Sequence, residues 1–238
     1  MIDDKLILAI VPARGGSKGL KLKNLQPILG IPMISYAGNC ISSIKEIDRA
    51  IVSTDNDEIA KVAKSAGLDV PFRRPEEISD DYSSDIDVLI HAVQEIEKFD
   101  NKKYDIILML QPTSPLRKPE HIISAISMLV EGNWDAVWTV SQSDSKTHPL
   151  KQLTINGENL SLWDPSGKDI VARQQLDPIY HRNGVVYAFT RECILKQKTI
   201  LGKRTGALPL NGRFVSIDTE WDIQLVEFIL SKINNKTT

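Results

Sequence analysis

Short apolar runs alternate with stretches of helical periodicity along most of the chain. Four runs are rich in β-branched residues and have the length of buried strands: 6–11, 50–54, 105–110 and 136–140. Four stretches repeat their apolar positions every three or four residues, as amphipathic helices do: 31–44, 55–66, 84–97 and 119–130. Strands that alternate with crossover helices predict an α/β fold, with a mostly parallel, Rossmann-like sheet and helices on both faces.

The pattern changes after residue 140. Residues 141–182 are polar and punctuated by glycine and proline, which predicts a β-rich insertion rather than another crossover helix. A strand at 185–189, a short helical turn at 192–196 and an amphipathic helix at 222–233 follow. We therefore expect one domain over residues 1–238, with the insertion at 141–182 inside it.

Composition excludes several classes of protein. The 238 residues include 29 Lys and Arg and 31 Asp and Glu, so the formal net charge is −2. With 42% apolar residues and two cysteines, the chain is neither disordered nor a disulfide-stapled module. The charge balance predicts no binding to nucleic acid. No stretch reaches the roughly 18 apolar residues of a membrane span, so we expect no membrane partner and a cytoplasmic protein.

The segment 12–24 joins the first strand to the first helix and is the strongest candidate for a ligand site. It contains three glycines and four cations, Arg14, Lys18, Lys21 and Lys23, with no acid among them. Glycines let the backbone turn its N–H groups toward a ligand, and ligands bind at the carboxyl ends of strands in open α/β sheets. This combination favours polyphosphate binding. A solvated basic loop is the alternative, because the spacing matches neither a Walker A sequence nor a dinucleotide fingerprint.

Seven motifs in order give a more specific indication. They are the segments 11–25 (VPARGGSKGLKLKNL), 53–60 (STDNDEIA), 74–75 (RP), 110–117 (LQPTSPLR), 173–176 (RQQL), 182–184 (RNG) and 217–220 (IDTE). In type and order they resemble the motifs of CMP-N-acylneuraminate synthetases, the acylneuraminate cytidylyltransferases. The resemblance covers about residues 6–230. It implies a cytidylyltransferase that uses CTP to activate a sialic-acid-like nonulosonate, an anionic sugar, and releases pyrophosphate.

The resemblance also implies a set of nucleotide contacts. They are Ala13, Arg14, Gly15, Ser17, Lys18, Lys23, Asn24, Arg74 and Ser84. A simpler interpretation remains open for the last two. Ser83 or Ser84 caps the helix that follows, and Arg74 pairs with Glu76 or Glu77 on the surface.

Five residues are implied as sugar contacts: Gln111, Lys151, Arg173, Gln174 and Arg182. An anionic sugar needs cations for its carboxylate. Related 3-deoxy-manno-octulosonate (Kdo) enzymes carry an Asp near the strand end where this chain has Gln111. The alternatives are a rigid proline-rich turn at 111–117 and an ordinary surface lysine at position 151.

The segment before the last helix is implied to hold Mg²⁺, with Asp218 and Asp222 as candidate ligands. Many family members have a second Asp where this chain has Ser216, which weakens the expectation of a paired-carboxylate site. Thr219 and Asp222 also have the spacing of a helix-capping box. Within the resemblance, Arg14, Lys23 and Asp218 are the candidate catalytic residues.

Two other functions stay open at this point. One is a Kdo-type or other sugar nucleotidyltransferase, and the other is a non-catalytic nucleotide-binding regulator on the same fold. The resemblance further implies a homodimer, in which the β-rich insertion packs on a second subunit. The sequence leaves open which nonulosonate is the substrate.

Overall fold

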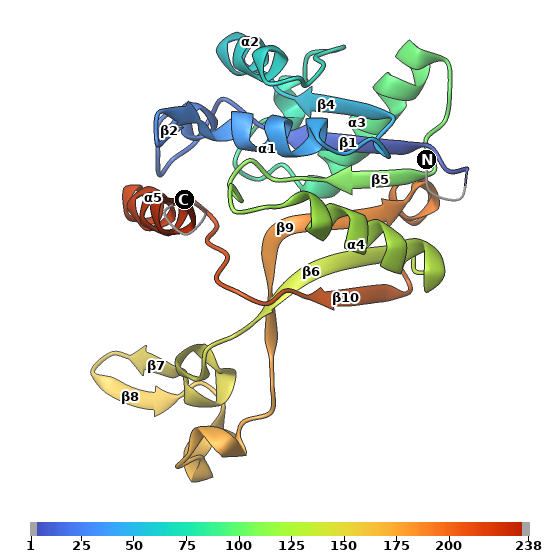
Figure 1. Cartoon of the computed structure of the whole chain (residues 1–238). Helices are drawn as coiled ribbons and strands as arrows, with labels where there is room; N and C mark the ends of the chain where they lie inside the picture. Colours follow the sequence, from blue (N-terminus) through green and yellow to red (C-terminus); the bar gives the residue numbers. More distant parts are fainter. Residues whose placement is uncertain (1–3, 235–238) are drawn as a thin grey trace.

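The computed structural model describes residues 4–234 and has a six-stranded sheet at its centre (Figure 1). The strands of this sheet are β1 (Ile7–Pro12), β4 (Arg49–Ser53), β5 (Ile106–Met109), β6 (Ala136–Gln142), β9 (Tyr180–Thr190) and β10 (Thr205–Pro209). Their order is β10-β6-β9-β5-β1-β4. β1 pairs in parallel with β4 and β5, and β10 pairs in parallel with β6, whereas β9 is antiparallel to both of its neighbours. The predicted α/β fold with a mostly parallel sheet is confirmed.

Helices cover both faces of the sheet. They are α1 (Met33–Ser42), α2 (Asp57–Ser65), α3 (Asp85–Asp100), α4 (Pro119–Glu131) and α5 (Glu220–Asn234). α1, α2 and α4 pack on one face, and α3 packs on the other with a helical segment at Cys193–Gln197. Successive residues of β1 enter the two cores in turn, so the whole strand is apolar.

The last helix, α5, lies beside the loop that follows β1. α5 packs against a short hairpin, β2 (Pro27–Ile28) and β3 (Ile31–Pro32), which follows that loop. Ile28, Ile217 and Val226 are buried together in this contact. The contact brings residues 216–218, which precede α5, close to the loop after β1.

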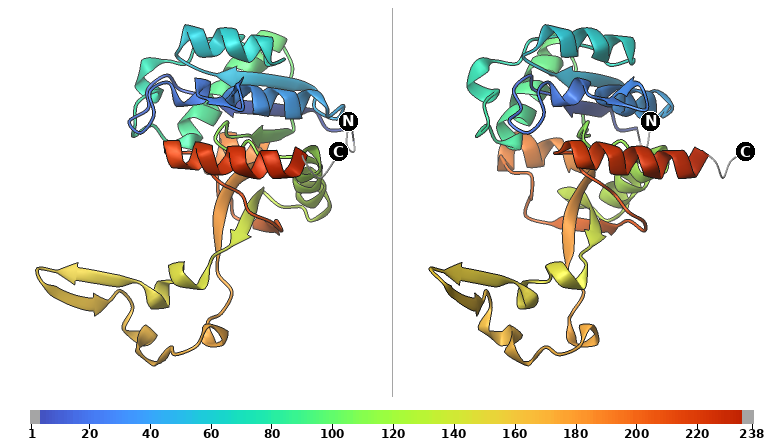
Figure 2. Two further views of the ribbon diagram at one scale, coloured as in Figure 1. Left: turned by 60° about the vertical axis from the view of Figure 1, so that its left-hand side comes forward. Right: turned by 90° about the vertical axis from the view of Figure 1, so that its left-hand side faces the viewer.

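Residues 143–179, called the projection from here on, extend away from the sheet (Figures 1 and 2). β6 and β9 lead into and out of it, paired as far as Gln142 and Tyr180. The projection contains one hairpin, β7 (Leu153–Asn156) with β8 (Asn159–Leu162). The remainder is loop and short 3₁₀ turns, so the projection has little regular structure of its own.

Several elements differ from the sequence-based expectation, among them the short hairpin β2–β3, which was not predicted. β9 has 11 residues instead of the predicted five, because its first half pairs with the end of β6. β10 was not predicted, and the turn expected at 192–196 is a π-helical segment at Cys193–Gln197. None of the helices within residues 4–234 is long and apolar enough to cross a membrane.

Candidate active site

A cavity of about 520 Å³ lies at the carboxyl ends of β1 and β5, beside the first half of the antiparallel strand β9. Its walls come from six separate parts of the chain: the loop after β1, Arg74, residues 80–88, residues 111–113, residues 182–187 and residues 216–218. This is the edge at which open α/β sheets bind ligands. Of the residues predicted as site residues, seven line the cavity: Arg14, Ser17, Lys23, Asn24, Arg74, Gln111 and Arg182, together with Asp218 from the predicted metal site.

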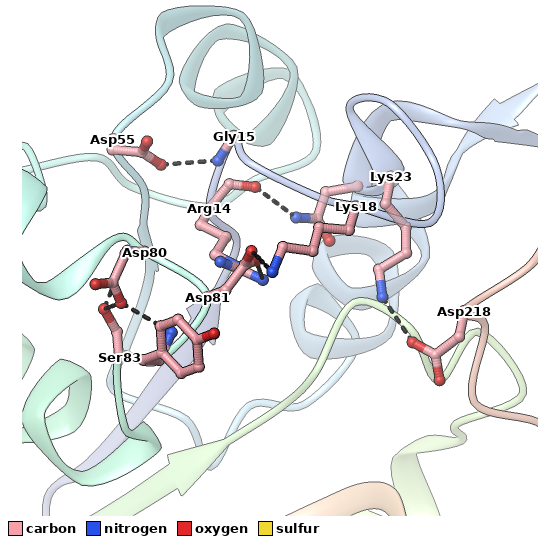
Figure 3. Close-up of polar contacts among 11 residues, drawn as sticks. Arg14, Gly15, Lys18, Lys23, Asp55, Asp80, Asp81, Ser83 and Asp218 are labelled. Carbon is pink, nitrogen blue, oxygen red and sulfur yellow. Dashed lines mark hydrogen bonds and ion pairs between the residues drawn. The ribbon is translucent and has the colours of Figure 1, made fainter.

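The glycine-rich loop is held in place by hydrogen bonds to its backbone. The Ala13 N–H donates to the Ser53 carbonyl at 2.9 Å, and the Gly15 N–H donates to the Asp55 carboxylate at 2.8 Å. The Asn24 side chain donates to the Arg14 carbonyl at 3.0 Å. Ala13, Gly15 and Asn24 thus shape the loop, and the side chains of Arg14 and Lys23 reach the cavity (Figure 3).

The cations of the loop are paired with acids from distant parts of the chain. Arg14 and Lys18 both contact Asp81, at 2.6 and 2.7 Å, and Lys23 contacts Asp218 at 2.8 Å (Figure 3). Hydrogen bonds from Lys18 and then Arg14 lower the pKa of the Asp81 carboxyl. The fourth cation, Lys21, is exposed and does not line the cavity. The loop therefore holds three ion-paired cations, of which Arg14 and Lys23 line the cavity and Lys18 is exposed beside it, joined to the lining residue Asp81.

Arg74 is buried beneath the cavity floor rather than on the surface. Its guanidinium donates to the Ser53 hydroxyl at 3.1 Å and to the Ser53 carbonyl. Burial lowers its pKa to about 10. The surface pairing with Glu76 or Glu77 was therefore wrong, and Arg74 is a fixed donor at the cavity.

Ser84, one of the two serines that the simpler interpretation allowed, caps α3. Its hydroxyl accepts from the Asp87 N–H at 3.3 Å and donates to the Asp87 carboxylate at 2.6 Å. Ser84 does not line the cavity, whereas its neighbours Ser83 and Asp85 do. Burial raises the pKa of the Asp85 carboxyl, and the nearby charges of Arg182 and Arg74 oppose that rise.

The loop after β5 is locked to β9 by a buried arginine. The Arg117 guanidinium donates to the carbonyls of Gln111 and Val185, at 2.6 and 2.5 Å, and burial lowers its pKa to about 10. Gly184 has a φ of +73°, and a Cβ there would lie 2.8 Å from the Gln111 side-chain oxygen. This close approach sets the Gln111 amide against the strand that carries Arg182.

The two acids before α5 have different environments. Asp218 lines the cavity, with one carboxylate oxygen on Lys23. One oxygen of Asp222 accepts three hydrogen bonds, from the Asp218 N–H, the Thr219 N–H and the Thr219 hydroxyl, at 3.0, 2.8 and 2.8 Å. Burial alone would raise the pKa of Asp222, but these bonds outweigh it and lower the pKa. Asp222 thus caps α5, and Ser216 lines the cavity beside Asp218.

Comparison with known proteins assigns the chain to a family. A profile of the family described as "Cytidylyltransferase" matches residues 8–231. The chain belongs to the cytidylyltransferase family. The match confirms the resemblance inferred from the seven motifs.

Two curated relatives and one solved structure are similar to this chain. The CMP-N,N'-diacetyllegionaminic acid synthase of Legionella pneumophila is 33% identical over 227 residues, 94% of this chain and 96% of that protein. The N-acylneuraminate cytidylyltransferase of Streptococcus agalactiae is 33% identical over 219 residues, 90% of this chain and 51% of that protein. The structure of a CMP:2-keto-3-deoxy-manno-octonic acid synthetase complexed with CTP superposes with a TM-score of 0.69. It covers 95% of this chain and 99% of that one at 18% identity, so it shows a shared fold.

Three residues predicted to bind the sugar lie outside the cavity of this cytidylyltransferase. Lys151, Arg173 and Gln174 belong to the projection. Arg173 and Gln174 line a separate hollow of about 360 Å³ at its base, beside His148. Within one chain, the structure does not bring these three side chains to Gln111 and Arg182.

Sequence reasoning missed the acidic side of the cytidylyltransferase cavity. Asp80, Asp81 and Asp85 line it, and in the sequence they are acids just before and at the start of α3. The signal that could have found them is their position around the start of the helix that follows the predicted contact Arg74. The pairing of Asp81 with Arg14 and Lys18 of the first loop depends on the fold.

Proposed function

We propose that this chain is a cytidylyltransferase that transfers CMP from CTP to the anomeric hydroxyl of a sialic-acid-like nonulosonate. One observation carries the proposal. The cavity combines the cationic glycine-rich loop with Gln111, Arg182 and Asp218, so an anionic nucleotide and an anionic sugar acid both find partners. The names of the relatives support the same substrate class.

In this proposal the three ion-paired cations of the loop bind the triphosphate. Arg14, Lys18 and Lys23 neutralise charge that develops on the phosphates, and Arg74 donates to the base or ribose side. The anomeric oxygen attacks the α-phosphorus in line and loses its proton. A new carbon–oxygen–phosphorus link forms, the bond to the β-phosphate breaks, and pyrophosphate leaves. The protein contributes mainly position and charge.

The residues near Asp218 fit a Mg²⁺ ion held by a single carboxylate. Asp218 is exposed to the cavity, only one of its oxygens is used by Lys23, and the Ser216 hydroxyl lies nearby. Mg²⁺ commonly binds through one or two carboxylates plus phosphate oxygens and water. When bound there, it would neutralise phosphate charge and acidify the attacking hydroxyl. Asp222 is left out of this site because its carboxylate caps α5.

A homodimer would complete the sugar site. The partner's projection would have to supply the equivalents of Lys151, Arg173 and Gln174. The hairpin of the projection supports a dimer interface. Cross-strand partners in a hairpin lie on the same face. One face of it is entirely apolar: Leu153, Ile155, Leu160 and Leu162. Three of these four side chains are more than half exposed. Light scattering tests the expected dimer, and a monomer at every concentration would contradict it.

The deciding experiment measures pyrophosphate release from CTP. Purified protein with Mg²⁺ is offered a panel of nonulosonates, with 3-deoxy-manno-octulosonate and a hexose phosphate as controls. We expect release with at least one nonulosonate and with neither control. CTP binding without release from any sugar would favour a non-catalytic nucleotide-binding protein instead. Use of CTP in this reaction agrees with a cytoplasmic location.

A further inference from the structure

Asp81 occupies the cations that the proposed function assigns to the triphosphate. One of its carboxylate oxygens contacts the Arg14 guanidinium at 2.6 Å, and the other contacts the Lys18 ammonium at 2.7 Å. Figure 3 shows the carboxylate between the two cationic side chains, with both oxygens in use. A carboxylate with two engaged oxygens presents these cations with the same charge-assisted contacts that two phosphate oxygens offer.

The conformation of residues 80–84 is held by other hydrogen bonds than these ion pairs. The Asp80 carboxylate accepts from the Tyr82 N–H at 2.9 Å and from the Ser83 hydroxyl at 2.7 Å. The Ser83 hydroxyl in turn accepts from the Asp80 N–H at 3.0 Å. Ser84 then caps α3. The hydrogen bonds of Asp80 and Ser83 therefore hold this turn. Asp81 lines the cavity and makes none of these bonds.

The charges that line the cavity also indicate that Asp81 competes with a phosphate ligand. Four basic side chains line it, Arg14, Lys23, Arg74 and Arg182, and four acidic ones oppose them: Asp80, Asp81, Asp85 and Asp218. A site for a triphosphate would be expected to keep an excess of positive charge. The charges of this lining are balanced instead, and Asp81 contacts Arg14 of the lining together with Lys18 of the same loop.

We propose that Asp81 is an internal competitor for the phosphate groups and so sets the affinity for CTP and the release of pyrophosphate. The proposal rests on the proposed function for the identity of the ligand. In the free protein, Asp81 pairs with Arg14 and Lys18. The incoming phosphates take both cations, and the Asp81 carboxylate turns to solvent. When pyrophosphate leaves, Asp81 re-forms its two contacts, which shortens the time the product stays bound.

Calorimetric titration with inorganic pyrophosphate at fixed Mg²⁺ tests the competition directly. Asp81→Asn keeps the shape of the side chain and removes its charge. We expect this variant to bind pyrophosphate about 3–10-fold more tightly than the wild type, the scale set by two partly exposed ion pairs. Asp81→Glu, which keeps the charge, should stay within about twofold of the wild type. The gain of Asp81→Asn should shrink in high salt.

Glu77→Gln is the matched control, because it removes one negative charge from the same segment. Glu77 is exposed, and within the described residues it has no hydrogen bond or ion pair from its side chain. This variant should bind pyrophosphate as the wild type does. Unchanged or weaker binding by Asp81→Asn, or an equal gain in Glu77→Gln, would overturn the proposal. A thermal melt of each variant confirms that it is folded before binding is compared.

The competition and the proposed function fail in different ways. If the wild type released no pyrophosphate from CTP with any sugar, the proposed function would be lost. The binding difference between Asp81→Asn and Glu77→Gln would still report whether Asp81 competes with phosphate. If turnover is present, Asp81→Asn should also be inhibited more strongly by added pyrophosphate. Equal inhibition of the two variants would contradict the role in product release.

Discussion

The α/β body and the projection bury their apolar side chains in opposite ways. In the body, every residue from Ile7 to Val11 in β1 is fully buried between two layers of helices. In the projection, only His148 and Gly167 are buried, and Ile155 on the hairpin is 73% exposed. The body thus has a hydrophobic core of its own, whereas the projection leaves its apolar face exposed.

The same contrast separates the two halves of the proposed substrate site. The nucleotide half, with Arg14, Lys23 and Arg74, is assembled within one chain and fixed by hydrogen bonds to Ser53, Asp55 and the loop itself. The sugar half has Gln111 and Arg182 in the cavity, but Lys151 and Arg173 lie in the projection. Substitutions in the two regions can therefore test whether the body folds on its own and whether the proposed sugar site needs a second subunit.

The largest expected effect is on the stability of the body. Leu108 is fully buried in the central strand β5, so Leu108→Ala should lower the free energy of unfolding by about 2–5 kcal/mol. The same change at Leu160, which is 63% exposed on the hairpin, should cost less than about 0.5 kcal/mol in the monomer. Urea denaturation at a single low protein concentration measures both. Similar losses would show that the projection carries a core of its own.

The next effect concerns turnover. Lys23→Ala removes a cation that contacts Asp218 in the cavity, and we expect kcat/KM for CTP to fall at least ~100-fold, the scale of one preorganised electrostatic contact. Stability should change little, because the Lys23 pair is partly exposed. Lys21→Ala is the matched control from the same loop, since Lys21 is exposed and lies outside the cavity. Near-normal turnover by Lys23→Ala would remove Lys23 from the catalytic machinery.

Local pattern was enough to predict the body. The alternation of apolar runs and helical stretches identified β1, β4, β5 and the four helices α1–α4 to within a few residues, because each element buries its own face. β10 was missed since it contains Gly206 and Pro209 and forms an edge strand through its pairing with β6. The extra length of β9 likewise comes from pairing with a strand about 40 residues away.

The site shows the same division. The glycines and cations of the first loop are adjacent in sequence, so phosphate binding could be predicted from them. Asp81 and Asp85 reach the same cavity only after the sheet has formed. Arg117 belongs to the motif 110–117 but received no role, because its partners are the backbone carbonyls of Gln111 and Val185, which only the fold brings to it. Local spacing left Ser83 and Ser84 as candidate caps of α3, and the structure assigns the cap to Ser84.

A third effect is expected on association. Ile155→Asp places a charge on the apolar face of the hairpin, so it should shift the proposed dimer toward monomer by at least tenfold in dissociation constant, since a buried unpaired charge is costly. Thr154→Asp is the matched control, because residue 154 points to the opposite, polar face. Light scattering over a dilution series compares the two. CTP binding should survive in both variants, and equal dissociation would show that the apolar face is not the interface.

The smallest effect is a pH dependence that belongs to the body alone. His91 lies on α3 with its ring edge-on to Phe72, and burial lowers its pKa below the ordinary value of 6.5; Arg74 acts in the same direction and Glu95 against it. The unfolded chain therefore takes up this proton first as the pH falls. The stabilisation from a neutral His91 is complete above about pH 6.5 and is lost below it. His91→Gln should lose less stability than the wild type between pH 7.5 and 5.0 in urea titrations, and equal losses would exclude His91 as a source of acid sensitivity.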